Sequence, residues 1–379
     1  MNVVVVDVKE NHTKIALLKG GHALEVFIDI KDKPSKVGNI YIATVRDVHP
    51  KFCFVTIKDK NGEEEQAFLQ EQSLKIGEKV LVQVHKDKQI NKDSTLSKLT
   101  FVSKAINLAG KYIVLRKNSF GINASKKLSQ EDDKSEIVSK FCPEGFGIVL
   151  RTASKDASLE EIKEEITYLR EKIIRMENED TNKLLYSPNE ITYYESSLRH
   201  LLPEAEKIVT NNNIEEIKKI CKGYNINFTT YNENHDLFKE YEIDKQIDLR
   251  EKVWLKKGGY ILIEQTKALI SIDVNTGKSS QKNLFLGTNK EAAEEIAKQL
   301  RLRNLSGIIL IDFISMTSID NRNELLKHLT EETNKDRIKV NVLGFTNLGL
   351  VELTRKKTRE PLKTSLYHLR EFLEESLEK

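Results

Sequence analysis

Between residues 37 and 103, hydrophobic and polar positions alternate in several short runs, which is the pattern of β-strands that bury one face. Glycine and asparagine residues lie between the runs, as in turns. The runs cover residues 38–45, 52–57, 66–69 and 79–84. Several short strands in one such stretch predict a small barrel of the OB type.

A helical period follows further along the chain. Ser158 and Glu161 match the capping box that begins many helices. The apolar residues that then recur at helical spacing, and so predict an amphipathic helix, are Leu159, Ile162, Ile166, Leu169 and Ile173. Apolar segments at residues 110–115 and 145–152 precede this helix, and both predict strands.

The last third of the chain alternates strand and helix patterns, which is typical of an α/β domain. Strands are predicted at residues 260–264, 268–273, 307–311 and 339–343. Helices are predicted at residues 289–303 and 321–333. Residues 308–311 are all apolar, which predicts a central strand that is covered on both faces.

Length and composition exclude several classes of protein. The chain has 379 residues, more than one hydrophobic core usually organises, so we expect roughly two to four packed units. No apolar run approaches the roughly 20 residues that a membrane span needs. The chain begins with a predicted strand rather than a signal peptide, so a cytoplasmic protein is expected. Cys53, Cys142 and Cys221 are far apart, which argues against a disulfide framework and against a four-cysteine zinc site.

Charge adds one local feature. The net charge of +3 says little about partners, but residues 75–127 contain 12 lysines and arginines against 3 acidic residues, a local charge of +9. A solvated, lysine-rich surface explains such a run more often than a ligand site does. An RNA-binding face is the alternative.

The most informative polar residues lie at strand ends in the last third of the chain. Asp273 and Asn275 project to one face of their strand, while the residues between and beside them project to the other. Asp312 directly follows an apolar strand, at the end where open α/β sheets place their ligands. Mg²⁺ suits such a pair, because it is commonly held by one or two carboxylates together with water and phosphate oxygens. Strand-end aspartates that are satisfied by backbone amides or lysines are an alternative of equal weight.

Three segments of the same region resemble the catalytic domain of the RNase E and RNase G family. They are residues 268–277, 288–307 and 308–316, and the long stretch of similarity without gaps makes the resemblance specific. Weaker similarity covers residues 38–41, 108–115 and 147–153, so that nearly the whole chain is included. The resemblance implies an endoribonuclease.

The resemblance also implies a multidomain fold of mixed α+β and α/β class. An RNase H-like subdomain is expected to be split between residues 1–36 and 190–248. An OB-type RNA-binding barrel is expected at residues 37–103, and a 5′-sensor region at residues 104–189. A DNase I-like α/β catalytic domain with a C-terminal helix is expected at residues 249–379.

Catalytic roles follow from the same resemblance. It implies that Asp273 and Asp312 ligate Mg²⁺, for which Mn²⁺ can substitute. Asn275 is implied either to bind near the scissile phosphate or to orient an aspartate. Cleavage is implied to leave a 3′-hydroxyl and a 5′-phosphate.

The family senses a 5′-monophosphate, and its sensor motif aligns with Gly110, Val114, Arg151 and Thr152. An arginine fork and a hydroxyl suit a terminal phosphate better than the point charge of a lysine. Without the resemblance, Arg151 and Thr152 would be interpreted as a surface pair that ends a strand.

In the barrel, Phe54 and Phe68 align with aromatic residues that contact RNA bases, and Lys86 and Lys92 align with basic residues that hold the strand. Stacking on aromatic rings tolerates any base, which suits single-stranded RNA with a loose A/U preference. The alternative for the two phenylalanines is a place in the barrel core.

The sequence departs from the family pattern in several places. Family members usually continue into a Cys-Pro-x-Cys zinc link and a small dimerisation domain, and neither motif is found here. We therefore expect no zinc, and any homodimer is expected to form without a zinc link. Ile57 stands where an aromatic residue is common, and Ser315 replaces an acid that is common after the second metal aspartate. The last apolar residues, from Leu362 onward, predict an amphipathic helix that would cap the domain or self-associate.

The expected function is therefore a cytoplasmic, Mg²⁺-dependent endoribonuclease that cleaves single-stranded A/U-rich RNA, with stimulation by a 5′-monophosphate, in RNA processing or decay. One alternative is an RNA-binding relative that cuts weakly or not at all. A further alternative is a nuclease acting on DNA, since the catalytic fold is expected to be DNase I-like.

Overall fold

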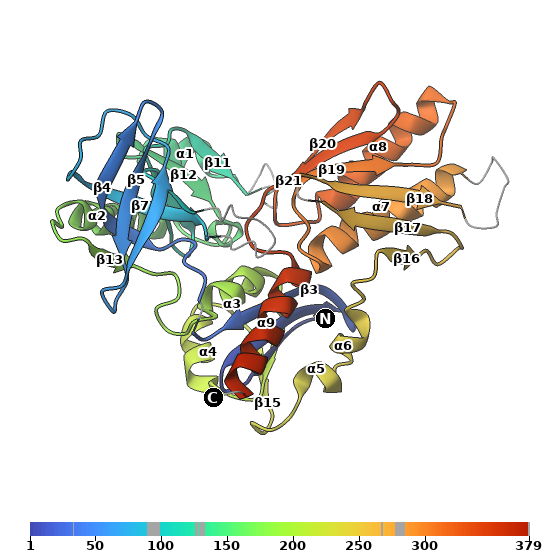
Figure 1. Ribbon diagram of the computed structural model, residues 1–379, viewed down its shortest axis with the longest axis horizontal. Coiled ribbons are helices and arrows are strands. Elements are labelled where there is room, and N and C mark those ends of the chain that lie inside the picture. The colour runs from blue at the N-terminus through green and yellow to red at the C-terminus, as the bar shows by residue number, and fades with distance from the viewer. Residues whose placement is uncertain are drawn as a thin grey trace. The chain divides into compact units, whose positions relative to one another are not determined.

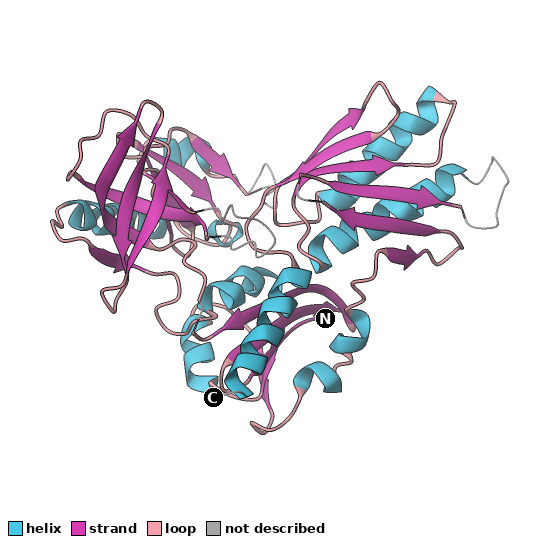
Figure 2. Ribbon diagram, in the orientation of Figure 1, coloured by secondary structure: helices cyan, strands magenta, loops and turns pink. Residues whose placement is uncertain are grey.

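The structure, a computed structural model, describes residues 1–32, 34–88, 99–125, 128, 133–266, 268–276 and 285–377. The chain folds into two compact units, of which one joins Met1–Pro34 to Ser196–Lys379 and the other is Ser35–Glu195. Figures 1 and 2 show the helices and strands of each unit. Across the described ranges, no helix is both long enough and apolar enough to cross a membrane.

The first unit contains two sheets, and the first of them has the strand order β15-β14-β1-β2-β3. The strands β1 to β3 are antiparallel neighbours, whereas β14 and β15 run parallel to β1. The strands are β1 (Asn2–Val8), β2 (His12–Lys19), β3 (His22–Ile30), β14 (Lys207–Thr210) and β15 (Asn227–Thr230). The helical segments around them are α3 (Glu195–Leu201), η2 (Leu202–Glu204), α4 (Ile214–Ile220), α5 (Leu237–Glu240), α6 (Ile243–Gln246) and α9 (Leu362–Leu377). The valine-rich strand β1 lies at the centre, which explains why Val4, Val5 and Val6 are fully buried.

The last helix, α9, packs against β3 of this first sheet (Figure 1). Leu369 and Phe372 form a small buried cluster with Ile30 at the end of β3. From the sequence, this helix is expected to complete the domain formed by residues 249–379. The structure differs, because the apolar face of α9 is buried on the sheet that contains the N-terminal strands.

The second sheet has the strand order β16-β17-β18-β19-β21-β20. Only β18 and β19 pair in parallel among these neighbours, and the helix between them makes the crossover that a parallel pair requires. The strands are β16 (Lys252–Trp254), β17 (Tyr260–Gln265), β18 (Ile270–Asn275), β19 (Gly307–Asp312), β20 (Val340–Phe345) and β21 (Val351–Arg355). The helices α7 (Phe285–Leu302) and α8 (Ile319–Thr333) share one core with the sheet. The predicted strands and helices of this region are confirmed, with small shifts of their ends.

Only one face of this second sheet is covered by α7 and α8. Ile309 and Ile311 are fully buried in the shared core, whereas Ile308 is 54% exposed on the opposite face. The prediction that residues 308–311 are covered on both faces is therefore wrong for one face. Successive residues of β19 point to opposite faces of the sheet, and the buried ones all point to one face. Both helices therefore lie on that face. The uncovered side is called the open face below.

A buried acid connects the two sheets of the first unit. Glu25 of β3 accepts hydrogen bonds from Arg301 at 2.8 Å and from Arg337 at 2.7 Å, and His200 lies 3.4 Å from it. Burial opposes the ionisation of Glu25, but the hydrogen bond from His200 and the charges of Arg337 and Arg301 outweigh it and lower its pKa. The end of α7 and the segment after α8 are thereby tied to β3.

The second unit begins with a closed barrel. The strand order is β4-β5-β6-β8-β7, and β4 also pairs with β7 and closes the ring. The strands are β4 (Ile40–His49), β5 (Phe52–Lys58), β6 (Glu64–Leu69), β7 (Lys79–Lys86) and β8 (Thr100–Ser103), and β13 (Lys183–Tyr186) pairs with β4 outside the ring. One long strand serves both neighbours, because β4 pairs with β7 along its first half and with β5 along its second half. The closed barrel of five strands is consistent with the predicted OB type.

A second sheet of this unit has the order β11-β12-β10-β9. Its strands are β9 (Asn107–Ala109), β10 (Ile113–Lys117), β11 (Ile122–Ala124) and β12 (Phe146–Leu150), and the helical segments are α1 (Ser135–Ser139), η1 (Thr152–Ser154) and α2 (Leu159–Glu177). The predicted capping box of Ser158 and Glu161 is confirmed, with both reciprocal hydrogen bonds present. The apolar stripe of α2 packs on the sheet, as its spacing predicts, through Ile162, Ile166, Leu169 and Ile173.

Candidate active site

Two parallel strands place the predicted metal ligands side by side. Asp273 of β18 lies directly opposite Asp312, the last residue of β19. Neighbouring strands are about 4.8 Å apart, so residues in register on parallel strands project to the same face as close neighbours. Both carboxylates are exposed, and they lie on the open face of the sheet. The fold thus assembles a carboxylate pair from two segments that are distant in the sequence.

Asn275 lies on the same face, two residues beyond Asp273. Its Nδ2 donates a hydrogen bond to Oδ2 of Asp273 at 2.6 Å. The alternating side chains Ile272 and Val274 are buried in the core beneath, which fixes the direction of the polar residues. Of the two roles implied for Asn275, the structure provides a geometry for the orientation of an aspartate.

A residue that the sequence patterns did not single out holds the loop after Asp312. Asn289 of α7 is fully buried, and its side chain exchanges two hydrogen bonds with the backbone of Ile314, at 2.8 and 3.0 Å. This clamp fixes the chain two residues after Asp312. A buried amide on the apolar face of α7, one turn before Ala293, is the signal that could have identified it.

Among the described residues, the carboxylate pair has no compensating cation. In the part of the chain that the structure describes, neither Asp273 nor Asp312 forms an ion pair with a lysine or accepts a backbone amide. The alternative of strand-end aspartates satisfied in this way thus finds no support there. Within the same ranges, no group of three or more His, Cys, Asp or Glu side chains could hold a metal ion. Two carboxylates nevertheless fit Mg²⁺, because it takes its other ligands from water and substrate phosphates.

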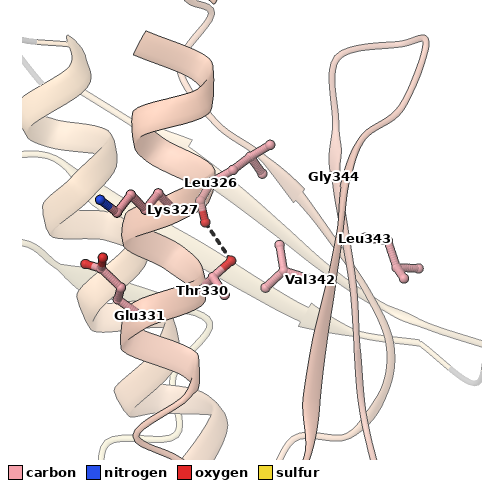
Figure 3. Close-up of a pocket in the computed structure, with 7 residues that line it drawn as sticks. All are labelled: Leu326, Lys327, Thr330, Glu331, Val342, Leu343 and Gly344. Atoms are coloured by element: carbon pink, nitrogen blue, oxygen red, sulfur yellow. Dashed lines mark hydrogen bonds between the residues drawn. The ribbon is translucent and has the colours of Figure 1, made fainter. Parts of the chain in front are cut away.

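Among the described residues, the carboxylate pair lies on an exposed face of the sheet. A hollow of about 300 Å³ lies between α8 and the edge strand β20, lined by residues such as Leu326, Thr330 and Val342 (Figure 3). None of the predicted site residues is among the described residues that line it. Small-molecule sites are usually concave and bury most of the ligand. An exposed pair on an open sheet face suits an extended substrate better.

In the barrel, the two predicted RNA-binding phenylalanines lie outside the core. Phe54, Phe68, Phe101 and Lys86 form one row in register across β5, β6, β8 and β7. The rings are partly exposed, with centroids 6.2 Å apart for Phe54 and Phe68 and 6.0 Å apart for Phe68 and Phe101. The exposed Lys86 places its Nζ 5.8 Å from the ring centroid of Phe101. The barrel core is instead filled by the residues that alternate with these rings, including Cys53 and Val55.

This row extends beyond the residues that the sequence identified. Phe52 lies 5.2 Å from Phe68 and stacks on His49 at 4.5 Å. With Phe101, these residues share the outward positions of their strands, so strand alternation was the available signal. Lys92 lies outside the described residues.

The surplus of positive charge in residues 75–127 is partly neutralised in space. Lys79 pairs with Asp180 at 2.7 Å, and Lys104 pairs with Glu71 at 3.4 Å. Lys117 also forms an ion pair, with Glu177 of α2. Three of the basic residues are thus paired with acids from outside the segment, which favours the structural interpretation for these three.

The predicted sensor residues gather around the turn from β9 to β10 and the end of β12. The Arg151 guanidinium donates a hydrogen bond to the carbonyl of Gly110. The hydroxyl of Thr152 lies 3.3 Å from the hydroxyl of Ser125. Val114 pairs with Val149 on β12, two residues before Arg151. The four aligned residues therefore belong to one end of one sheet.

Glu165 of α2 is a further residue of this region that the sequence patterns did not identify. Its carboxylate accepts the backbone N–H groups of Lys111, Tyr112 and Ile113 at 2.6 to 2.9 Å. A Cβ at Gly110 would overlap this carboxyl carbon, so a larger residue would require Glu165 to move from the turn. Glu165 thereby holds the turn whose carbonyl receives Arg151.

Comparison with known proteins adds independent information. A sequence model of the Ribonuclease E/G family matches residues 107–358. Ribonuclease G of Haemophilus influenzae is 33% identical to this chain in an alignment that covers 95% of this chain and 80% of that protein. Ribonuclease G of Escherichia coli is 31% identical, with 95% and 81% coverage. Ribonuclease E of Escherichia coli is 27% identical over 95% of this chain but only 37% of its own length.

Proposed function

Because this chain belongs to the Ribonuclease E/G family, we propose that it is an endoribonuclease that cuts single-stranded RNA at the open face of its second sheet. The observation that carries the proposal is the pair of exposed carboxylates, Asp273 and Asp312, in register on parallel strands. The substrate is proposed to be A/U-rich RNA, and the setting RNA processing or decay in the cytoplasm.

Asp273 and Asp312 are proposed to hold Mg²⁺, with Mn²⁺ as a substitute. When bound, the ion supplies a Lewis acid that neutralises charge on the scissile phosphate. Asn275 restrains the Asp273 carboxylate through its hydrogen bond, and Asn289 holds the loop that follows Asp312. These two amides act as supports, because a metal site is only as well ordered as the groups that position its ligands.

The second unit is proposed to bind the RNA chain and its 5′ end. The outward row of Phe54, Phe68 and Phe101 offers ring faces to bases, and Lys86 offers a charge to the backbone. Arg151 and Thr152, supported by the turn at Gly110 and by Val114, are proposed to bind a 5′-monophosphate. Lys92 is proposed as a further backbone contact on the resemblance alone.

The architecture implied by the family is proposed in the same terms. Three antiparallel strands followed by two parallel ones, as in the sheet of β1, support an RNase H-like subdomain. The sheet of Asp273 and Asp312, with both helices on one face, supports the DNase I-like catalytic domain. Any homodimer is proposed to form without a zinc link.

The test is a cleavage assay on matched RNA and DNA oligonucleotides of A/U-rich sequence. We expect RNA products with 5′-phosphate ends in Mg²⁺ or Mn²⁺, no products in EDTA, and faster cleavage when the RNA carries a 5′-monophosphate instead of a 5′-hydroxyl. The variant D312N should not cleave. E264Q is the matched control, because Glu264 is an exposed acid on the same face, opposite Ser271, outside the proposed site.

Three results would contradict the proposal. Cleavage by D312N at the wild-type rate would remove the carboxylate pair from the mechanism. RNA binding without products in either metal would identify an RNA-binding relative that does not cut, and preferred cleavage of DNA would identify a deoxyribonuclease.

A further inference from the structure

A cluster of aromatic and basic side chains lies on the open face, beyond the residues used so far. The indole of Trp254 and the phenol ring of Tyr260 meet edge to face, with centroids 5.5 Å apart. The ammonium group of Lys252 lies 4.0 Å from the Trp254 centroid and 3.8 Å from the Tyr260 centroid. The lysine therefore holds both rings by cation–π attraction, which orders side chains that would otherwise be mobile on a surface.

Strand register connects this cluster to the candidate active site. Trp254 lies opposite Tyr260, and Tyr260 lies opposite Asn275, so the three form one row across β16, β17 and β18. In the next row, Lys252 lies opposite Leu262, which lies opposite Asp273. Since paired residues share a face, all of these side chains project to the open face. Two strand spacings, about 10 Å, separate the indole strand from the strand of Asp273.

The turn between β16 and β17 fixes this arrangement. Gly258 and Gly259 both have positive φ angles, of 97° and 92°, which favour glycine. A side chain at Gly259 would overlap the backbone carbonyl oxygen of Asn275. The hairpin that carries Trp254 is thus packed directly against the end of the strand that carries Asp273.

The solvent exposure of Trp254 and Tyr260 favours a binding role for the cluster. Trp254 is 66% exposed although it is the largest apolar side chain type, and its neighbour Tyr260 is partly exposed. Burial therefore does not account for the indole in this position. An ordered, solvent-facing indole beside a cation offers a π-face to a nucleobase and a charge to the adjoining phosphate.

We propose that Trp254, with Tyr260 and Lys252, forms a stacking subsite for the nucleobase of an RNA nucleotide that flanks the scissile phosphate. This inference rests on the proposed function, because the phosphate is placed at Asp273 and Asp312. Stacking tolerates every base, so the subsite positions the strand and does not select its sequence. Trp254 is a binding residue in this scheme, and it takes no part in proton or metal chemistry.

Trp254 is the only tryptophan of the chain, so its fluorescence reports on this subsite alone. The experiment uses the D312N protein with Mg²⁺, which binds RNA without cutting it, and a 5′-phosphorylated, U-rich single-stranded oligoribonucleotide. Fluorescence anisotropy of labelled RNA measures total binding, and tryptophan emission measures stacking in the same titration. We expect saturable quenching with the same midpoint as the anisotropy. Oligonucleotides with one abasic nucleotide, on the 5′ or the 3′ side of the cleavage position, should identify the stacked base by loss of quenching.

Kinetics of the cleaving enzyme provide a second readout. Replacing Trp254 by alanine should raise KM roughly tenfold with a smaller change in kcat, which is the loss expected for one stacked base. W254F should recover most of this loss, because it restores a ring face. Y367A is the matched control, since Tyr367 is an exposed aromatic residue on α9, and its cleavage should be unchanged.

The outcomes separate the two proposals. Saturating RNA binding without any change in tryptophan emission, or wild-type kinetics in W254A, would overturn the stacking subsite while leaving the endoribonuclease intact. Absence of both RNA binding and RNA cleavage by the wild-type protein would overturn the proposed function, and the subsite with it.

Discussion

Two acidic sites of the first unit differ in whether nearby side chains compensate the negative charge of their carboxylates. Glu25 is buried between the sheets and is surrounded by Arg301, Arg337 and His200, so its charge is compensated on several sides. Asp273 and Asp312 lie side by side on the open face, where two like charges are in register. The first arrangement stabilises the fold at the cost of desolvation. The second is unfavourable for the fold by itself, because like charges directly opposite each other destabilise a sheet.

The comparison shows how to distinguish structural from functional acids in this protein. A structural acid such as Glu25 has its own cations, and its removal takes from Arg301 and Arg337 their nearer acidic partner. The open-face pair has no such partner among the described residues, which is the arrangement that the proposed metal site requires. The two sites should therefore respond to substitution in opposite ways.

The largest effect is expected for Asp273→Asn. The rate of RNA cleavage should fall on the order of a thousandfold, because charge on the phosphate loses a major source of stabilisation. The free energy of unfolding in EDTA should stay the same or rise, since the repulsion between neighbouring carboxylates is removed. Initial rates and urea unfolding curves measure the two quantities on one preparation. A large loss of stability would show that Asp273 is a structural residue like Glu25.

Glu25→Gln should have the opposite effects, a loss of stability with cleavage retained. The free energy of unfolding should fall by about 3 to 5 kcal/mol, because the buried charges of Arg301 and Arg337 lose their nearer acidic partner and retain the more distant Glu204, at 3.9 and 3.7 Å. Urea unfolding at neutral pH measures the loss, and cleavage per folded molecule should be retained. Because the folded-state pKa of Glu25 is lowered, its contribution is present above the ordinary carboxyl range and is lost as the pH falls through the folded value. E215Q, which breaks the exposed pair of Glu215 with Lys218, is the control and should leave stability unchanged.

His12 provides a third case, a buried titratable group whose pKa is governed by burial and by two lysines. Burial, followed by the charges of Lys14 and Lys9, lowers the pKa of His12 from 6.5 to about 4. Between pH 6.5 and about pH 4, His12 is protonated in the unfolded chain but stays neutral in the folded chain. The free energy of unfolding should therefore decrease as the pH falls toward 4. His12→Gln should reduce this decrease by about 3 kcal/mol. Denaturant unfolding at neutral pH and near pH 4 measures the difference, and an equal slope in both proteins would contradict it.

The smallest effect is expected for Asn275→Ala, which leaves both carboxylates in place. Loss of the hydrogen bond to Asp273 should raise the Mg²⁺ concentration for half-maximal cleavage by about tenfold to a hundredfold. Cleavage at saturating Mg²⁺ should recover in part, which distinguishes a supporting residue from a metal ligand. A Mg²⁺ titration that matches the wild type would show that this hydrogen bond has no role in the site.

Particular residues show where sequence reasoning succeeded. The alternation in residues 40–84 predicted the barrel strands, and Ser158 with Glu161 predicted the start of α2. Asp312 was placed correctly at a strand end, whereas the strand of Asp273 continues for two more residues, to Asn275. Family membership, which the resemblance implied, is confirmed by the comparisons. Each of these signals is local or lies in a continuous stretch of similar residues.

Other features depend on partners that local patterns do not contain. Ile308 looks like a residue of a fully covered strand, yet it is exposed because both helices lie on the other side. Lys79, Lys104 and Lys117 look like free charges, yet acids on other elements or in other turns pair with them. Phe54 and Phe68 are compatible with a core or a surface position until the barrel closes and the direction of each ring is known.

The sequence by itself determined the strand and helix periods, the residue types at strand ends and the family. Only the tertiary structure decided that Asp273 faces Asp312, that Asn289 clamps the following loop and that Trp254 shares a face with the carboxylate pair. The physical reason is that periodicity arises from the backbone geometry of a few adjacent residues, whereas register and covered faces arise from contacts between distant segments. The proposed chemistry of this protein belongs to the second kind of information.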